Sequence, residues 1–139
     1  TQSNVILVSD TRRPLSGTLD VLWGGFYEGR KTSLSLSFTG APKEGLKIGG
    51  GWDVDWVRLP QGDFSSQILS GDIAWSLSNA LLLQSLFQWD KEDKSLAANL
   101  RLSWEYKDQS WFYFIVNPSY QNGNNSVLVL TKLTFRWDP

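Results

Sequence analysis

The chain has 139 residues, which is enough for one domain and too few for two of ordinary size. With 13 Lys and Arg residues against 14 Asp and Glu residues, its formal charge is -1, so there is no basic excess and we expect no nucleic-acid partner. Cys and His are both absent, which excludes disulfides, thiolate or imidazole metal ligands and the commonest general base; we therefore expect no metal, no cofactor and no catalytic activity.

Taken in chain order, the elements expected are an amino-terminal segment followed by one all-β domain. Residues 1–15 are expected to be an extension or a partial extra strand, because 5–8 are apolar and 10–14 read as a turn. Residues 16–139 are expected to form a β-barrel. Its eight strands are predicted at 16–26, 31–39, 45–57, 65–77, 80–89, 95–106, 111–117 and 126–137.

Alternation of apolar and polar residues is the basis of these predictions. In the clearest run, Leu34, Leu36 and Phe38 share one face of a strand while the serines between them share the other. Each strand with its turn takes about 15 residues, which suits membrane-spanning strands of about 9 to 11 residues. No apolar run approaches the roughly 18 to 20 residues of a membrane-spanning helix, and residues 1–4 do not resemble a signal peptide.

The apolar face of such a sheet has two possible environments. In an antiparallel up-and-down transmembrane β-barrel it faces lipid, whereas in a soluble eight-stranded barrel it faces inward; a β-sandwich binding module is a third alternative. Aromatic residues near strand ends favour the membrane barrel, because amphipathic rings gather at the two lipid interfaces. The aromatics expected there are Trp23, Trp52, Trp56, Trp75, Trp89, Trp104, Tyr106 and Trp137.

The polar face is rich in Ser, Thr, Gly, Asn and Gln, and its acids and bases nearly balance, as an enclosed interior requires. The residues expected in an interior polar network are Asp53, Asp55, Asp72, Arg101, Glu105 and Lys132. The two longest connections, 58–64 and 118–125, are expected on one side of the sheet, as the long outer loops of bacterial barrels are.

Five segments in this order resemble a known family: FYEGRKTSL at 26–34, LPQGDF at 59–64, LQSLFQW at 83–89, ANLRLSWEY at 98–106 and KLTFRW at 132–137. They are similar to the carboxy-terminal outer-membrane β-barrel region of a family of unknown function, whose long members carry an amino-terminal carbohydrate-binding-like β-sandwich. The resemblance implies an outer-membrane location. The chain departs from the family in lacking the sandwich and most of the longer barrel, and in ending Asp138-Pro139 where members tend to end on an aromatic residue.

Paired carboxylates are the one catalytic pattern in the sequence. Asp53 and Asp55 share a strand face, with Asp72 expected on the neighbouring strand, but an interior of eight strands is filled by side chains and leaves no cleft for a glycosidase. We therefore expect a bacterial outer-membrane barrel with a structural, anchoring or complex-subunit role. Its expected partners are outer-membrane lipid and other subunits of an envelope complex or the rest of a larger barrel. The alternative is a soluble β-barrel or sugar-binding module whose Trp residues hold a ligand.

Overall fold

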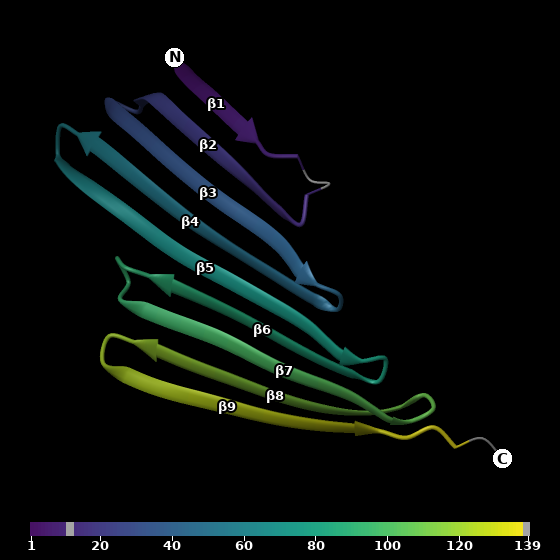
Figure 1. Cartoon of the computed structure of the whole chain (residues 1–139). Coiled ribbons are helices and arrows are strands. Elements are labelled where there is room, and N and C mark those ends of the chain that lie inside the picture. Colours follow the sequence, from purple (N-terminus) through teal and green to yellow (C-terminus); the bar gives the residue numbers. More distant parts are fainter. Residues whose placement is uncertain (11–12, 138–139) are drawn as a thin grey trace.

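The computed structural model describes residues 1–10 and 13–137, and every regular element in them is a β-strand (Figure 1). The nine strands in this part of the chain are β1 (Gln2–Val8), β2 (Leu15–Phe26), β3 (Gly29–Lys43), β4 (Leu46–Leu59), β5 (Gly62–Ser78), β6 (Leu81–Asp90), β7 (Ser95–Lys107), β8 (Ser110–Gln121) and β9 (Asn124–Thr134). The all-β class predicted from alternation is confirmed. The described residues include no helix with the length and hydropathy required to cross a membrane.

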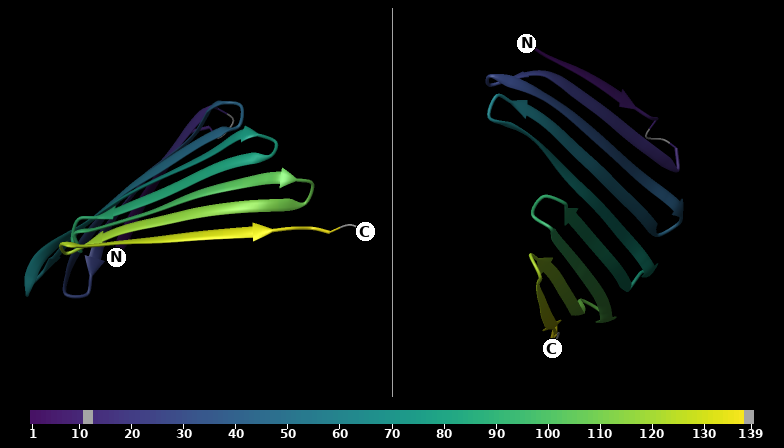
Figure 2. Two further views of the ribbon diagram at one scale, coloured as in Figure 1. Left: turned by 90° about the horizontal axis from the view of Figure 1, so that it is seen from below. Right: turned by 90° about the vertical axis from the view of Figure 1, so that its left-hand side faces the viewer.

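All nine strands belong to one sheet in which spatial order equals chain order, and each strand is antiparallel to the next. The sheet bends into an arc, with β1 and β9 at its opposite ends (Figure 2). Each of these two edge strands pairs with one neighbour in the described sheet, so the sheet is open. Because the number of strands in this meander is odd, β1 and β9 run in the same direction.

The sheet differs from the predicted eight-stranded barrel in strand number and in being open. The additional strand is β1, which pairs with β2 from Gln2 opposite Gly24 to Val8 opposite Thr18. Its apolar residues are consecutive, so they lie on both faces of the sheet and show no alternation. For this reason the sequence predicts either an extension or a partial extra strand at residues 1–15. If the sheet closed into a barrel, β1 and β9 would become neighbours. Because they run in the same direction, they would have to pair in parallel, unlike the antiparallel neighbours elsewhere in the sheet. The expected turn at 10–14 includes residues 11 and 12, which lie outside the described residues.

Most hairpins close with two-residue turns, so the lengths predicted for the connections at 58–64 and 118–125 are wrong, although both turns lie on the same side of the sheet. β4 and β5 remain paired to Leu59 opposite Gly62, and β8 and β9 remain paired to Gln121 opposite Asn124. The second turn is Asn122-Gly123, and both residues have positive φ, 49° and 87°. Asn-Gly suits this geometry because Gly has no Cβ and Asn tolerates the left-handed region, so the turn matches the strand twist.

β8 extends past Pro118, where the sequence reading ended the predicted strand. Pro118 pairs with Val127 of β9, whereas the pairing with β7 is interrupted between Ala97–Ser119 and Leu100–Val116. Proline has no backbone N–H, so Pro118 cannot donate a hydrogen bond to β7, and the β7–β8 ladder is interrupted there. The Asn99 side-chain Nδ2 donates a hydrogen bond to the Asn117 side-chain Oδ1 inside this gap, which joins β7 to β8 there.

The cross-strand register separates two faces, which we call the apolar face and the polar face. One row of the apolar face runs across β2 to β7 through Leu19, Leu36, Trp52, Leu69, Trp89 and Leu96. The adjacent row of the polar face runs through Asp20, Ser35, Asp53, Ile68, Asp90 and Ser95. The segregation follows directly from the two-residue period of the strands.

The sheet is a single layer, and few side chains are buried. Val54 and Val57 are the buried apolar residues and Ser103 and Ser110 the buried polar ones among the described positions. Most large apolar side chains remain accessible, as Leu36 at 44% and Leu100 at 41% exposure illustrate. In residues 1–10 and 13–137 no second layer of secondary structure covers the apolar face.

Candidate functional site

The candidate site is the apolar face, on which six of the eight aromatics expected at a lipid interface lie. Register and alternation place there Trp23, Trp52, Trp56, Trp75, Trp89 and Trp104. Four of them are exposed by between 39% and 48% where the strands approach a turn: Trp23, Trp56, Trp89 and Trp104. The face is thus apolar in its middle, with tryptophans toward both ends of the strands.

The two ends of the apolar face each have their own tryptophans. Trp23 and Trp56 belong to one row, on either side of Thr32, close to the β2–β3 and β4–β5 turns. Trp75 and Trp104 lie toward the opposite turns, and the Lys43 ammonium stands 4.6 Å from the centre of the Trp75 ring. Trp52 lies deeper in its strand than Trp56, so it belongs to the middle of the face.

The remaining two predicted aromatics, Tyr106 and Trp137, occupy the carboxy-terminal corner. Tyr106 lies at the bulge of β7, where its hydroxyl donates a hydrogen bond to the Thr134 carbonyl oxygen at 3.1 Å. Its ring meets Trp104 edge to face at 6.1 Å between centroids. Trp137 follows β9, is 76% exposed, and lies 6.4 Å from the Phe135 ring centroid. The expected carboxy-terminal Asp138-Pro139 lies outside the described residues.

The six residues predicted for a polar network all lie on the polar face, but the structure does not join them to one another. No described ion pair links two of the six. Asp55 pairs instead with Lys31, whose ammonium is 3.1 Å from the carboxylate, with side chains 27% and 39% exposed respectively. Lys31 also lies 5.9 Å from the Phe26 ring centre.

The other members of the predicted network contact groups of several kinds. The Arg101 guanidinium lies 5.1 Å from the centre of the Tyr113 ring, and the Glu105 carboxylate accepts a hydrogen bond from the Gln109 backbone N–H at 2.9 Å. The Asp72 carboxylate occupies the space that a side chain at Gly49 would fill. Asp53 stands opposite Ser35 and Lys132 opposite Tyr113. These contacts are dispersed over the face, and the described residues hold no metal-binding cluster of acids.

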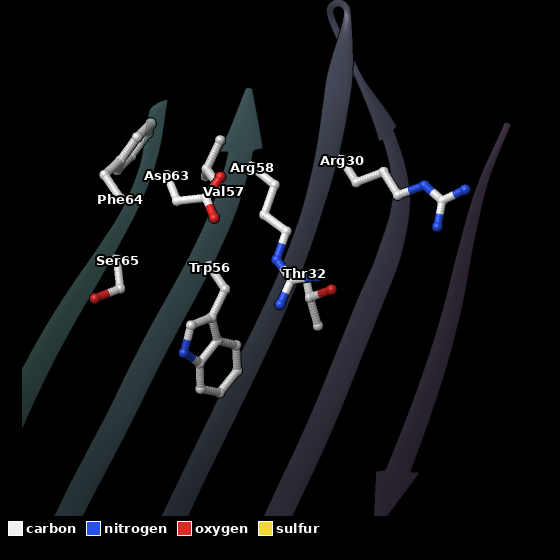
Figure 3. A pocket seen from close by; sticks show the side chains of 8 residues that line it. All are labelled: Arg30, Thr32, Trp56, Val57, Arg58, Asp63, Phe64 and Ser65. Atoms are coloured by element: carbon white, nitrogen blue, oxygen red, sulfur yellow. The ribbon is translucent and has the colours of Figure 1, made fainter. Parts of the chain in front are cut away.

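Several residues that matter in this arrangement were missed by the sequence reading. Lys31 directly precedes Thr32 in a strict alternation, so the pattern already assigned it to the polar face. Arg30 and Arg58 line a hollow of about 670 Å³, and the sequence analysis missed them because each lies near a turn (Figure 3). Asp20 is another such residue, since its Oδ1 is buried with no hydrogen-bond partner among the described residues.

Comparison with protein-family models, curated proteins and solved structures finds no match to this chain. The family resemblance of the five sequence segments therefore stays a prediction.

Proposed function

We propose that this chain belongs to a bacterial outer-membrane β-barrel protein, with a structural, anchoring or complex-subunit role and no catalytic activity. The observation that carries the proposal is the uncovered apolar face, bounded by tryptophans toward both ends of its strands. Lipid is the partner that covers such a face, because hydrocarbon contacts the aliphatic middle while the indole rings reach the polar interface.

The exposed area supports a non-aqueous environment. A globular protein of 15.7 kDa exposes about 7,300 Å² by the usual scaling with mass, whereas this chain exposes 10237 Å². Much of the surface is large apolar side chains, which a water-soluble monomer keeps to small patches. Lipid would cover the apolar face in a bilayer, and interior groups or partner strands would cover other parts of the sheet. Together these contacts would remove the excess of exposed area over that of a globular protein.

The height of the apolar face also suits a bilayer. On β4 it runs from Leu46 to Trp56, which at about 3.3 Å per residue is roughly 33 Å of strand. A tilt of about 45° shortens this to roughly 23 Å along the membrane normal, close to the apolar band of about 25 Å in membrane barrels.

The direction of the edge strands favours the rest of a larger barrel as the partner. Bacterial membrane barrels are antiparallel and even-stranded. Because β1 and β9 run in the same direction, antiparallel neighbours at both edges require an odd number of further strands between them. A second copy in the same membrane orientation would set β9 against β1 and make a parallel seam, so we favour a different strand-bearing segment.

A soluble sugar-binding module is the second candidate, and one hollow favours it. This hollow of about 430 Å³ on the apolar face is lined by Leu36, Phe38, Trp52, Leu69 and Trp89 among others. Indole rings beside such a space can stack on a sugar ring. This candidate predicts that oligosaccharides shift the tryptophan fluorescence of the chain in plain buffer.

Adjacent residues on opposite faces provide the test, because the chain has no Cys and single cysteines can be introduced cleanly. Ser35→Cys and Leu36→Cys would each carry a nitroxide in lipid bilayers, and accessibility to oxygen and to a water-soluble nickel complex would be measured. We expect the label at position 36 to be the more accessible to oxygen, which concentrates in hydrocarbon. A chain that stays folded and monomeric without detergent, with position 36 shielded and position 35 open to the nickel complex, would overturn the proposal.

A further inference from the structure

Two arginines lie opposite each other on the apolar face, one row farther toward the turns than Trp23 and Trp56. Arg30 of β3 pairs in register with Arg58 of β4, and Asp63 of β5 follows Arg58 in the same row. The neighbour of Arg30 on β2 is Gly25, which has no side chain to fill the adjacent space. The backbone positions of both arginines therefore lie beyond the row of Trp23 and Trp56 at this end of the sheet.

Neither arginine forms an ion pair in the part of the chain that the structure describes, although Lys31 next to Arg30 has Asp55 as a partner. Like charges directly opposite each other in a sheet destabilise it. Asp63 offsets one of the two charges in the row and leaves an excess of one positive charge. This position therefore favours an external anion.

The surroundings suit a phosphate group. Arg30 and Arg58 line a hollow of about 670 Å³ together with Trp56 and the hydroxyl-bearing Thr32 and Ser65. In Figure 3 the Arg58 side chain reaches from β4 across β3 toward Thr32, and the Arg30 side chain reaches across β2. Guanidinium groups bind phosphate oxygens through paired hydrogen bonds, and hydroxyls supply further donors.

The backbones of β3 and β4 are closely packed at the positions from which the two arginines project. Gly29 at the start of β3 lies so close to the Arg58 carbonyl that any side chain at Gly29 would overlap this oxygen. The β2–β3 and β4–β5 hairpins are thus tightly packed beside the hollow. A site built on such strands is more precise than one built on a loop.

We propose that Arg30 and Arg58 bind the phosphate of a lipid headgroup at this end of the sheet. The inference rests on the proposed function, since it requires Trp23 and Trp56 to lie at the lipid interface. The strand positions of both arginines are then at the level of the headgroups, and the Arg58 guanidinium lies at the level of Thr32 and Trp56 (Figure 3).

The test uses the chain folded in neutral maltoside micelles. Binding of dioctanoyl phosphatidic acid, of dioctanoylglycerol and of inorganic phosphate is measured by native mass spectrometry and by phosphorus NMR. The variants are Arg30→Gln/Arg58→Gln and Arg30→Lys/Arg58→Lys. The matched control is Lys91→Gln/Lys94→Gln, which removes two charges from the β6–β7 turn at the same end of the sheet.

We expect the wild type and the Lys91/Lys94 control to bind phosphatidic acid within twofold of each other and not to bind dioctanoylglycerol. The double Gln variant is expected to bind at least roughly tenfold more weakly, as the loss of charge-assisted hydrogen bonds implies. The double Lys variant keeps both charges, so it distinguishes loss of the guanidinium hydrogen bonds from loss of folding. Its affinity for phosphatidic acid is expected to lie between those of the wild type and the double Gln variant.

Equal weakening in the control and in the double Gln variant would overturn the site. So would equal affinity for phosphatidic acid and dioctanoylglycerol, while inorganic phosphate binding as tightly as the lipid would overturn the headgroup as the source. A chain that folds only in detergent but shows no phosphate preference contradicts this inference and leaves the membrane proposal intact. A chain that folds without detergent contradicts the membrane proposal itself.

Discussion

Phe38 lies over Gly50, with its ring in the space that a side chain at Gly50 would occupy. A Cβ at Gly50 would overlap two of the Phe38 ring carbons, Cε1 and Cζ. The arrangement recurs on the next pair of strands, β5 and β6, where the Phe87 ring covers Gly71. The four residues form one row of the apolar face, with the two glycines opposite each other. Glycine has no side chain to cover the backbone hydrogen bonds of the sheet, and the aromatic ring of the neighbouring strand covers them instead.

Gly50→Ala is expected to destabilise the folded sheet by about 1–2 kcal/mol, because the Phe38 ring must move from its position. In a Phe38→Ala background the same change should cost nothing, since the space is then free. Denaturant titration of the four chains in detergent measures this coupling. The matched control is Gly25→Ala, where the nearest atoms lie 3.9 Å from the new Cβ. Equal effects in the two backgrounds would contradict the contact.

Lys31→Gln and Asp55→Asn each remove one member of the ion pair on the polar face. Because the side chains are 27% and 39% exposed, we expect a coupling free energy of under about 1 kcal/mol. High salt should reduce it further, since the pair is accessible to ions. A double-mutant cycle at two salt concentrations gives the measurement. A coupling above roughly 3 kcal/mol that resists salt would indicate a pair enclosed far more deeply than its exposure suggests.

Hydrogen exchange should distinguish the edge strands from the centre. In the isolated chain folded in detergent, outward-pointing amides of β1 and β9 have no ladder partner, whereas β4 and β5 are paired on both sides. We expect the edges to exchange much faster than the centre, measured by mass spectrometry of peptic fragments. Addition of a segment that pairs with the edges should slow them selectively. Equal protection across all nine described strands of the isolated chain would mean that the edges are already paired.

Much of the sheet could be predicted from the sequence, because alternation is a local property that survives without knowledge of the neighbours. The strand at 95–106 matches β7 to within one residue, and the face of every predicted tryptophan within a strand follows from its parity. Turns were predicted less well. The Asn122-Gly123 pair is a strong hairpin signal, whereas the predicted connection at 118–125 is longer than the observed turn.

Pairing and sheet closure depend on distant residues, and the sequence did not specify them. Pro118 ended a predicted strand because a proline usually does, yet β8 continues, since the missing N–H falls where β7 leaves the ladder. The expected polar network assumed that balanced charges meet, but Asp55 meets Lys31 because they lie diagonally across adjacent strands. Balance of charge across a face does not determine which side chains contact each other.

Because the described strands form a single layer, contacts between neighbouring strands determine the order in which the chain unfolds. All substantial contacts between strands join neighbours in the chain, so the sheet behaves as a one-dimensional array of hairpins with nearest-neighbour coupling. Mechanical force applied at one terminus should detach strands in sequence, in steps of roughly a dozen residues. Folding should likewise spread along the chain by zippering, without any long loop having to close first.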